Sequence, residues 1–246
     1  MKKRIVLGIV VSLLMVLVAG CGGASQPSEP AESKDNNNTV TKEEQSKEPV
    51  DLVLKDSHYK IEDGYVFYTI AVENPNTGFM PMFANIKITG RKADGSIAFS
   101  DDWTISSLAP QSTTYWASQA GHGDVTEEDT IELSISVDKD NWQKSSPKPA
   151  DLYVFDNVSV IPESYGGLRV TGEITLTDET VDYGINGVTE PMLVCVFKDA
   201  DGNLVGGFSS YVDSDLTEGT PSVFDIGCYH EIGDYVTAEM YANPWL

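Results

Sequence analysis

The chain has 246 residues, with 38 Asp and Glu against 16 Lys and Arg and a formal net charge of -22. So acidic a surface repels nucleic acid and anionic lipid headgroups, and we therefore expect no nucleic-acid partner. The chain has only three cysteines, and it is long enough to bury conventional hydrophobic cores without a disulfide framework.

The first 21 residues are organised like an export signal. Three basic residues at positions 2–4 precede an apolar run over residues 5–18, which is short for a membrane span, and small residues then lead to Cys21. The sequence VAGC at 18–21 resembles the lipobox of bacterial lipoproteins. This resemblance implies that residues 1–20 are removed, that Cys21 is diacylated, and that the lipid anchors the protein on the extracytoplasmic face of the cell membrane. The alternative is an ordinary secretory signal followed by a chance cysteine.

Residues 22–50 have almost no side chain that could be buried. Gly, Ser, Pro, Glu, Lys and Asn dominate, so residues 21–50 are predicted to be the lipidated cysteine and a disordered linker. As a random coil, this linker would span on the order of 30 Å. Without residues 1–20 the chain keeps 13 of its 16 basic residues and all 38 acidic ones, a formal charge of -25. We interpret this charge as a source of solubility and of spacing from a negatively charged envelope.

From residue 51 onward, hydrophobic and polar residues alternate, as in strands with one buried face. The clearest segments are 65–74, 84–88, 130–137 and 168–177. The residues expected to face a core are Val66, Tyr68, Ile70, Val72, Ala84, Ile86, Ile88, Ile131, Leu133, Ile135, Val137, Leu168, Val170, Ile174 and Leu176. We find no convincing helical period after the signal. The pattern predicts an all-β antiparallel sandwich.

The two halves of this region repeat each other in order. The Asp-Gly pair at 94–95 falls on the pair at 201–202, and Trp142 falls on Trp245. The stretch 141–150, rich in Ser, Pro and Lys, marks the boundary between the halves. A duplicated unit of this size can bury its own core.

We therefore predict two tandem immunoglobulin-like β-sandwich domains, at residues 51–146 and 147–246. The segments 196–205 (VFKDADGNLV) and 216–220 (LTEGT) resemble the FxLYD-type extracellular domains of bacterial lipoproteins, an immunoglobulin-like all-β family often found in tandem. At 91–95 the first half lacks the aromatic residue that precedes this turn. The resemblance implies an extracytoplasmic β-sandwich, and the family supplies no catalytic residues to carry over.

The segment DADGN at 199–203 looks like the start of a calcium loop, but its continuation has the pattern of a strand. Asp-Gly between apolar runs is a strong hairpin signal, so we interpret this segment as a turn rather than a calcium site.

Acidic clusters at 101–102, 127–129 and 138–140 could supply the paired carboxylates of a glycosidase, but we interpret them as solvated surface. No metal-ligand spacing occurs among the histidines, which are His58, His122 and His230. We expect no catalytic residue, no metal site and no cofactor, and we predict that the protein is not an enzyme.

Aromatic residues at strand ends allow two interpretations. Trp142 and Trp245 end their repeats, where an aromatic side chain would close the open end of a sandwich core. The alternative is a stacking platform for a sugar or a protein partner, to which residues near predicted turns could contribute: Trp103, Trp116, Tyr165, Tyr183 and Tyr211.

Cys195 and Cys228 are both predicted to point into the second core. They could form a disulfide between its sheets, but we favour two small buried thiols because free cysteine packs well in cores.

The sequence names no ligand. We expect a membrane-anchored protein that binds or scaffolds an unidentified envelope protein at the cell surface. The alternatives are a carbohydrate or peptidoglycan binding module and, less favoured, an envelope hydrolase.

Overall fold

The computed structural model describes residues 48–164, 166–184 and 187–245, all of which belong to one compact unit. The predicted signal peptide, Cys21 and most of the predicted linker lie outside the described residues. The described chain is almost entirely β-strand with one short 3-10 turn, η1 (Lys139–Asn141), which confirms the all-β class. The strands are β1 (Val53–Glu62), β2 (Tyr65–Asn74), β3 (Phe79–Arg91), β4 (Ile97–Ser107), β5 (Ser112–Ala120), β6 (Thr130–Ser136), β7 (Trp142–Lys144), β8 (Tyr153–Pro162), β9 (Leu168–Leu176), β10 (Pro191–Lys198), β11 (Leu204–Tyr211), β12 (Ser222–Cys228) and β13 (Thr237–Pro244).

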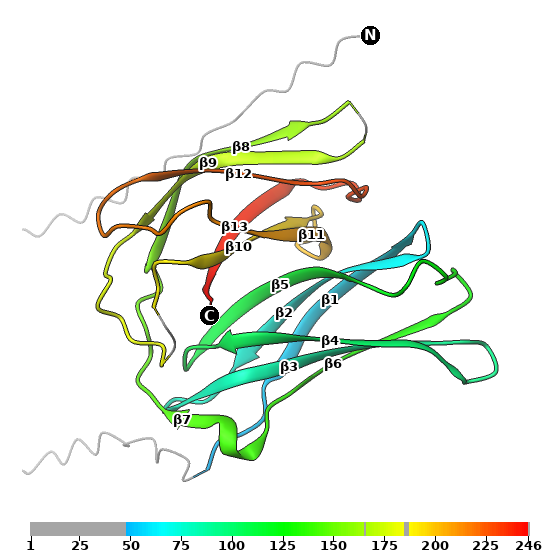
Figure 1. The fold of residues 1–246 in the computed structure, drawn as a ribbon, viewed down its shortest axis with the longest axis horizontal. Coiled ribbons are helices and arrows are strands. Elements are labelled where there is room, and N and C mark those ends of the chain that lie inside the picture. The colour runs from blue at the N-terminus through cyan, green and yellow to red at the C-terminus, as the bar shows by residue number, and fades with distance from the viewer. Residues whose placement is uncertain (1–47, 165, 185–186, 246) are drawn as a thin grey trace, which may run out of the picture. The chain divides into compact units, whose positions relative to one another are not determined.

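The first half is a sandwich of two antiparallel sheets (Figure 1). One sheet has the strand order β1-β2-β5 and the other β4-β3-β6, with β7 paired to β3. The residues of β2 and β3 that were predicted to face a core are buried between these sheets, because the pleat directs every second side chain to one face. Trp116 of β5 and Phe99 of β4 belong to the same core.

The second half repeats this topology. Its sheets have the orders β8-β9-β12 and β11-β10-β13, so the first, second and fifth strands of each half share one sheet and the third, fourth and sixth share the other. Immunoglobulin sandwiches divide strands A, B and E from strands C and F in the same way, although here the fourth strand pairs with the third instead of the fifth. The repeated sequence therefore corresponds to a repeated strand order.

Asp-Gly turns connect the third and fourth strands in both halves. Gly95 has a φ of 83° and Gly202 a φ of 86°, a region that glycine adopts without strain. The Asp199 carboxylate accepts hydrogen bonds from the backbone N–H groups of Asp201 and Asn203, at 2.9 Å each. The hairpin turn predicted for 199–203 is thus confirmed, whereas weak or absent calcium binding stays a prediction.

The two sandwiches pack against each other through one sheet of each. The outer face of sheet β1-β2-β5 contacts the outer face of sheet β11-β10-β13, and we call this contact the junction. Strand β10 is consequently buried on both faces, as is most of β2, which the one-face pattern expected from the sequence did not predict. The buried hydrophobic residues of the junction are Ala71, Ala117, Val194, Val196 and Leu204.

The other two sheets, β4-β3-β6 and β8-β9-β12, carry charged residues on their outer faces, which explains why no further sheet of the described chain packs there. Matching the halves strand by strand places Ala117 on Asp225 and Val194 on Lys87, both of which are exposed. Burying either charge at a further sheet contact would carry a large desolvation cost. The same topology therefore presents an apolar face at the junction and a charged face outside.

Close backbone approach and hydrogen bonds fix the junction. A Cβ on Gly207 of β11 would lie 2.9 Å from the Thr69 hydroxyl oxygen of β2 and 2.7 Å from the Cys195 carbonyl oxygen, so only glycine fits there. The Ser209 hydroxyl donates to the Ala117 carbonyl oxygen at 2.6 Å. These contacts hold strand β11 across the first sandwich.

Candidate functional site

Two of the recesses in the described part of the chain lie at the junction and combine residues from the two halves. The first, which we call the junction pocket, has a volume of about 460 Å³ and lies where the β4–β5 connection, the linker between the halves and β13 meet. The second, which we call the loop groove, has a volume of about 590 Å³ and is bordered by the connection between β12 and β13. Both volumes are in the range of small-molecule sites.

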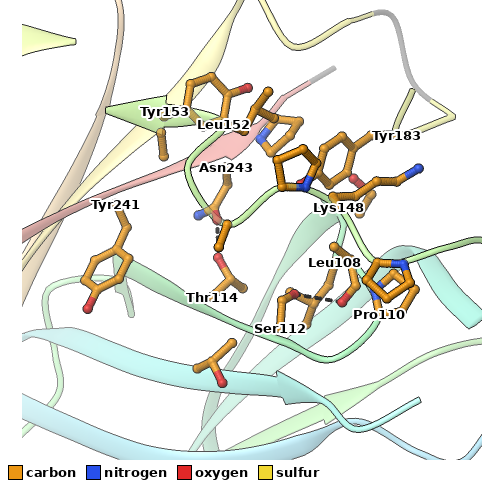
Figure 2. A pocket seen from close by; sticks show the side chains of 18 of the residues that line it. Leu108, Pro110, Ser112, Thr114, Lys148, Leu152, Tyr153, Tyr183, Tyr241 and Asn243 are labelled. Atoms are coloured by element: carbon orange, nitrogen blue, oxygen red, sulfur yellow. Dashed lines mark hydrogen bonds between the residues drawn. The ribbon is translucent and has the colours of Figure 1, made fainter. Parts of the chain in front are cut away.

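The junction pocket is walled by tyrosine, proline and small polar side chains. Figure 2 shows Tyr241 on one side of the pocket and Lys148 beside Tyr183 on another. The Lys148 Nζ lies 5.7 Å from the centroid of the Tyr183 ring, a cation–π distance. Burial raises the pKa of Tyr183 to about 12, so its hydroxyl keeps its proton at neutral pH.

Polar contacts fix the floor of this pocket. Asn243 of β13 contacts the Thr114 hydroxyl of β5 (Figure 2) and donates from Nδ2 to the Tyr115 carbonyl oxygen at 2.9 Å. The Tyr153 hydroxyl donates to the Val188 carbonyl oxygen at 2.7 Å. These bonds join β13 to β5 across the junction and tie Tyr153 to the backbone of its own half.

The connections around the pocket are held by Asn74 at the end of β2. Its Nδ2 donates to the carbonyl oxygens of Phe79 and Leu108, each at 2.9 Å, and its Oδ1 accepts from the backbone N–H of Asn76. Asn76 in turn bonds the backbone of Val50, so the end of the predicted linker is attached to the first half. Sequence reasoning missed this hub, although the Asn-Pro-Asn sequence at 74–76 directly after a strand is a detectable signal.

The loop groove is bordered by Tyr229 and His230, the first two residues of the segment 229–236, which we call the tyrosine loop. Tyr229 is 83% exposed, Val236 is 67% exposed and Tyr235 is 37% exposed. The neighbouring wall comes from β1 and β2 of the first half, including Glu62 and Phe67. The groove thus joins exposed aromatic side chains to an existing recess.

The tyrosine loop is tied to the first half. The His230 ring stacks on Phe67 with a centroid distance of 4.2 Å, and the Lys60 Nζ donates to the Glu231 carboxylate at 2.6 Å. The Glu231 backbone N–H donates to the Glu62 carboxylate at 3.2 Å. The loop therefore presents its exposed residues from a fixed base.

Lowering the pH should weaken the attachment of the tyrosine loop to the first half, because it protonates His230. Burial lowers the pKa of His230 below its ordinary value of 6.5, against the opposing effect of Glu62. Since the unfolded chain binds this proton more readily, the stability present above pH 6.5 is lost as the pH falls towards the lowered pKa. We expect the free energy of unfolding to fall less between pH 7.5 and pH 5.5 in His230→Phe, which keeps a ring on Phe67, than in the wild type. Equal losses in urea titrations would contradict the prediction.

Four aromatic side chains meet at the edge where β4, β5 and the end of β13 come together. Ring centroids of Trp103 and Trp116 are 6.1 Å apart, those of Trp116 and Trp245 are 5.6 Å apart, and those of Trp245 and Tyr211 are 5.7 Å apart. We call these residues the aromatic row. Trp103 is 39% exposed and Tyr211 is 51% exposed, whereas Trp116 is buried.

The two tryptophans that were predicted to close the sandwich ends both pack on the first core. Trp142 packs on the first core, as predicted for a residue that closes a sandwich end. Trp245 packs on that same first core and not on the second core, because the junction places the end of β13 beside β5. From its own half it contacts the Tyr211 ring. Tyr183 lines the junction pocket, and Tyr165 lies outside the described residues.

Cys195 and Cys228 are free thiols buried in the second core, on the face predicted for them. Burial raises the pKa of Cys195 to about 12, so it is a thiol and not a reactive thiolate at neutral pH. The Cys228 Sγ contacts the His230 carbonyl oxygen at 3.5 Å.

The acidic clusters occupy separate places. Asp101 lies on β4, where its carboxylate accepts the Gly121 N–H at 2.7 Å. The expectation of solvated surface is wrong for Asp129, whose buried carboxylate pairs with the Lys92 Nζ at 2.9 Å and accepts the Thr126 N–H at 2.9 Å. This aspartate stabilises the turn before β6.

Within the described part of the chain, no three His, Cys, Asp or Glu side chains gather as metal ligands would. Nor does any helix of that part have the length and apolar character needed to cross a bilayer. Neither a protein-family model nor a curated protein matches this chain.

Proposed function

We propose that this chain is a lipid-anchored extracytoplasmic binding protein that engages a protein partner of the cell envelope through the tyrosine loop and the loop groove. The observation that carries the proposal is the 83% exposure of Tyr229 on a loop whose base is fixed to the other sandwich. Tyrosines supply large amphipathic contact area at a low cost in conformational entropy. Loops on a rigid sandwich are common binding elements.

Crosslinking on intact cells tests the partner surface. A photo-reactive phenylalanine analogue in place of Tyr229 should give a specific crosslinked protein. The matched control is Val223, which is 76% exposed on the outer face of β12, away from the tyrosine loop. Crosslinked products of equal yield from both positions would contradict the proposed surface.

The anchoring part of the proposal rests on the sequence VAGC at 18–21. Two acyl chains suffice for stable membrane attachment where a single chain does not. The Cys21→Ser variant should lose incorporation of labelled palmitate and should leave the membrane fraction. Retention of this variant in the membrane fraction would show that the lipid on Cys21 is not the anchor.

A carbohydrate-binding role is the second candidate, and the aromatic row favours it. Trp103 and Tyr211 expose ring surface at the two ends of a continuous series of ring contacts. Exposed aromatic rings of this kind suit stacking on the apolar face of a sugar. If the row binds glycan, Trp103→Ala and Tyr211→Ala should each reduce co-sedimentation with purified peptidoglycan, and Tyr229→Ala should not. No difference among the three variants would exclude this role of the row.

A further inference from the structure

We propose that the junction pocket binds a small organic anion, with the charged group near Lys148 and the apolar part of the ligand against Leu108, Phe155 and Met240. This site is separate from the tyrosine loop and from the aromatic row, and its occupancy does not depend on the role proposed for either.

The first argument is the composition of the pocket wall. The chain has 38 acidic residues, yet none of the described residues that line the pocket is Asp or Glu. Lys148 is the one Lys or Arg among those described residues. In a strongly acidic protein, a recess free of carboxylates and bordered by a cation is the place where an anion meets least repulsion.

The second argument is the pairing of the basic residues. Lys55, Lys60, Arg91, Lys92, Arg169 and Lys198 all form ion pairs with carboxylates. Among described residues, four lysines form no such ion pair: Lys87, Lys139, Lys144 and Lys148. Of these, only Lys148 lines the pocket, with its Nζ 5.7 Å from the centroid of the Tyr183 ring. Lys144 and Lys148 both border a recess of about 450 Å³ next to the pocket, together with one carboxylate, that of Asp182. The cation at the rim is thus available to a ligand.

The third argument is the interior of the pocket. Its wall includes apolar side chains of both halves, among them Leu108 of the first half and Met240 of the second. The volume of about 460 Å³ suits a ligand with one or two rings. Charge at the rim and apolar surface within fit an amphipathic anion.

Anilinonaphthalene sulfonate, whose fluorescence rises in apolar sites, is a suitable probe, with neutral N-phenylnaphthylamine as its uncharged counterpart. Titrations use the chain from residue 22 onward. Lys148→Met should weaken binding of the sulfonate by about tenfold, the effect of losing one charge-assisted contact. Thr113→Glu, which places a carboxylate at an exposed position of the pocket wall, should weaken it similarly. Both variants should change the affinity of the neutral probe less than about twofold, as expected for a purely electrostatic change.

Lys139→Met is the matched control, because Lys139 is an exposed lysine on η1 outside the pocket. Its affinity for the sulfonate should equal that of the wild type. The proposal is overturned if the wild type does not bind the sulfonate. It is also overturned if Lys148→Met and Thr113→Glu bind it as tightly as Lys139→Met, or if both probes lose affinity equally.

Discussion

Replacing Val196 by aspartate is expected to lower the free energy of unfolding by about 3–5 kcal/mol, the cost of a buried charge without a partner. Val196 is fully buried at the junction, on the face of β10 that packs against the first sandwich. Val196 lies opposite Glu239 of β13, whose carboxylate already pairs with the Lys198 Nζ at 2.6 Å. The new carboxylate would therefore meet a like charge and would have to bind a proton or separate the two sheets. Urea denaturation followed by tryptophan fluorescence measures the effect.

Val223→Asp is the matched control, because Val223 lies on β12 and is 76% exposed. The same substitution there should change the free energy of unfolding by no more than about 0.5 kcal/mol. Equal effects at the two positions would mean that the sandwiches are not packed together in solution. If the wild type unfolds in a single step and the Val196→Asp variant unfolds in two steps, the junction couples the unfolding of the two halves.

Replacing Asn74 by alanine is expected to lower the free energy of unfolding by about 3 kcal/mol, because several buried polar groups lose their partners at once. The side chain is fully buried and bonds the carbonyl oxygens of Phe79 and Leu108 and the backbone N–H of Asn76. Since Leu108 lines the junction pocket, affinity for an anionic probe should fall as well.

The control for this substitution is Asn85→Ala on β3, the strand that follows β2 in the chain and lies in the other sheet. The Asn85 side chain has one long contact, 3.5 Å from Nδ2 to the Asp102 carboxylate, so its loss should cost about 0.5 kcal/mol or less. A loss at Asn74 no larger than that at Asn85 would show that the Asn74 network does not hold the connections between strands.

Both recesses depend on the junction, so their chemistry belongs to neither half alone. The junction pocket combines the β4–β5 connection with the end of β13, and the loop groove combines β1 and β2 with the tyrosine loop. Substitutions that open the junction should therefore affect both recesses, whereas Lys148→Met and Tyr229 substitutions act on one each. Comparing binding at the two recesses therefore distinguishes a variant that disrupts the packing of the two halves from one that removes a single contact.

The sequence by itself determined the strands, their core-facing residues and the repeated order of the two halves. Alternation at Val66, Tyr68 and Ile70 is a local property, because the pleat of a strand sends every second side chain to the same face. The Asp-Gly turns could also be predicted from the sequence, because their positive φ angles favour glycine in any surroundings.

Only the tertiary structure decided which outer faces meet. Ala71 is a small residue on the face of β2 that the alternation assigned to solvent, and nothing local distinguishes a face that contacts another sheet from one that contacts water. The approach of Gly207 to Thr69 joins positions 138 residues apart, and the stacking of His230 on Phe67 joins positions even further apart in sequence. The recesses, the aromatic row and the placement of Trp245 on the first core follow from that one contact between sheets.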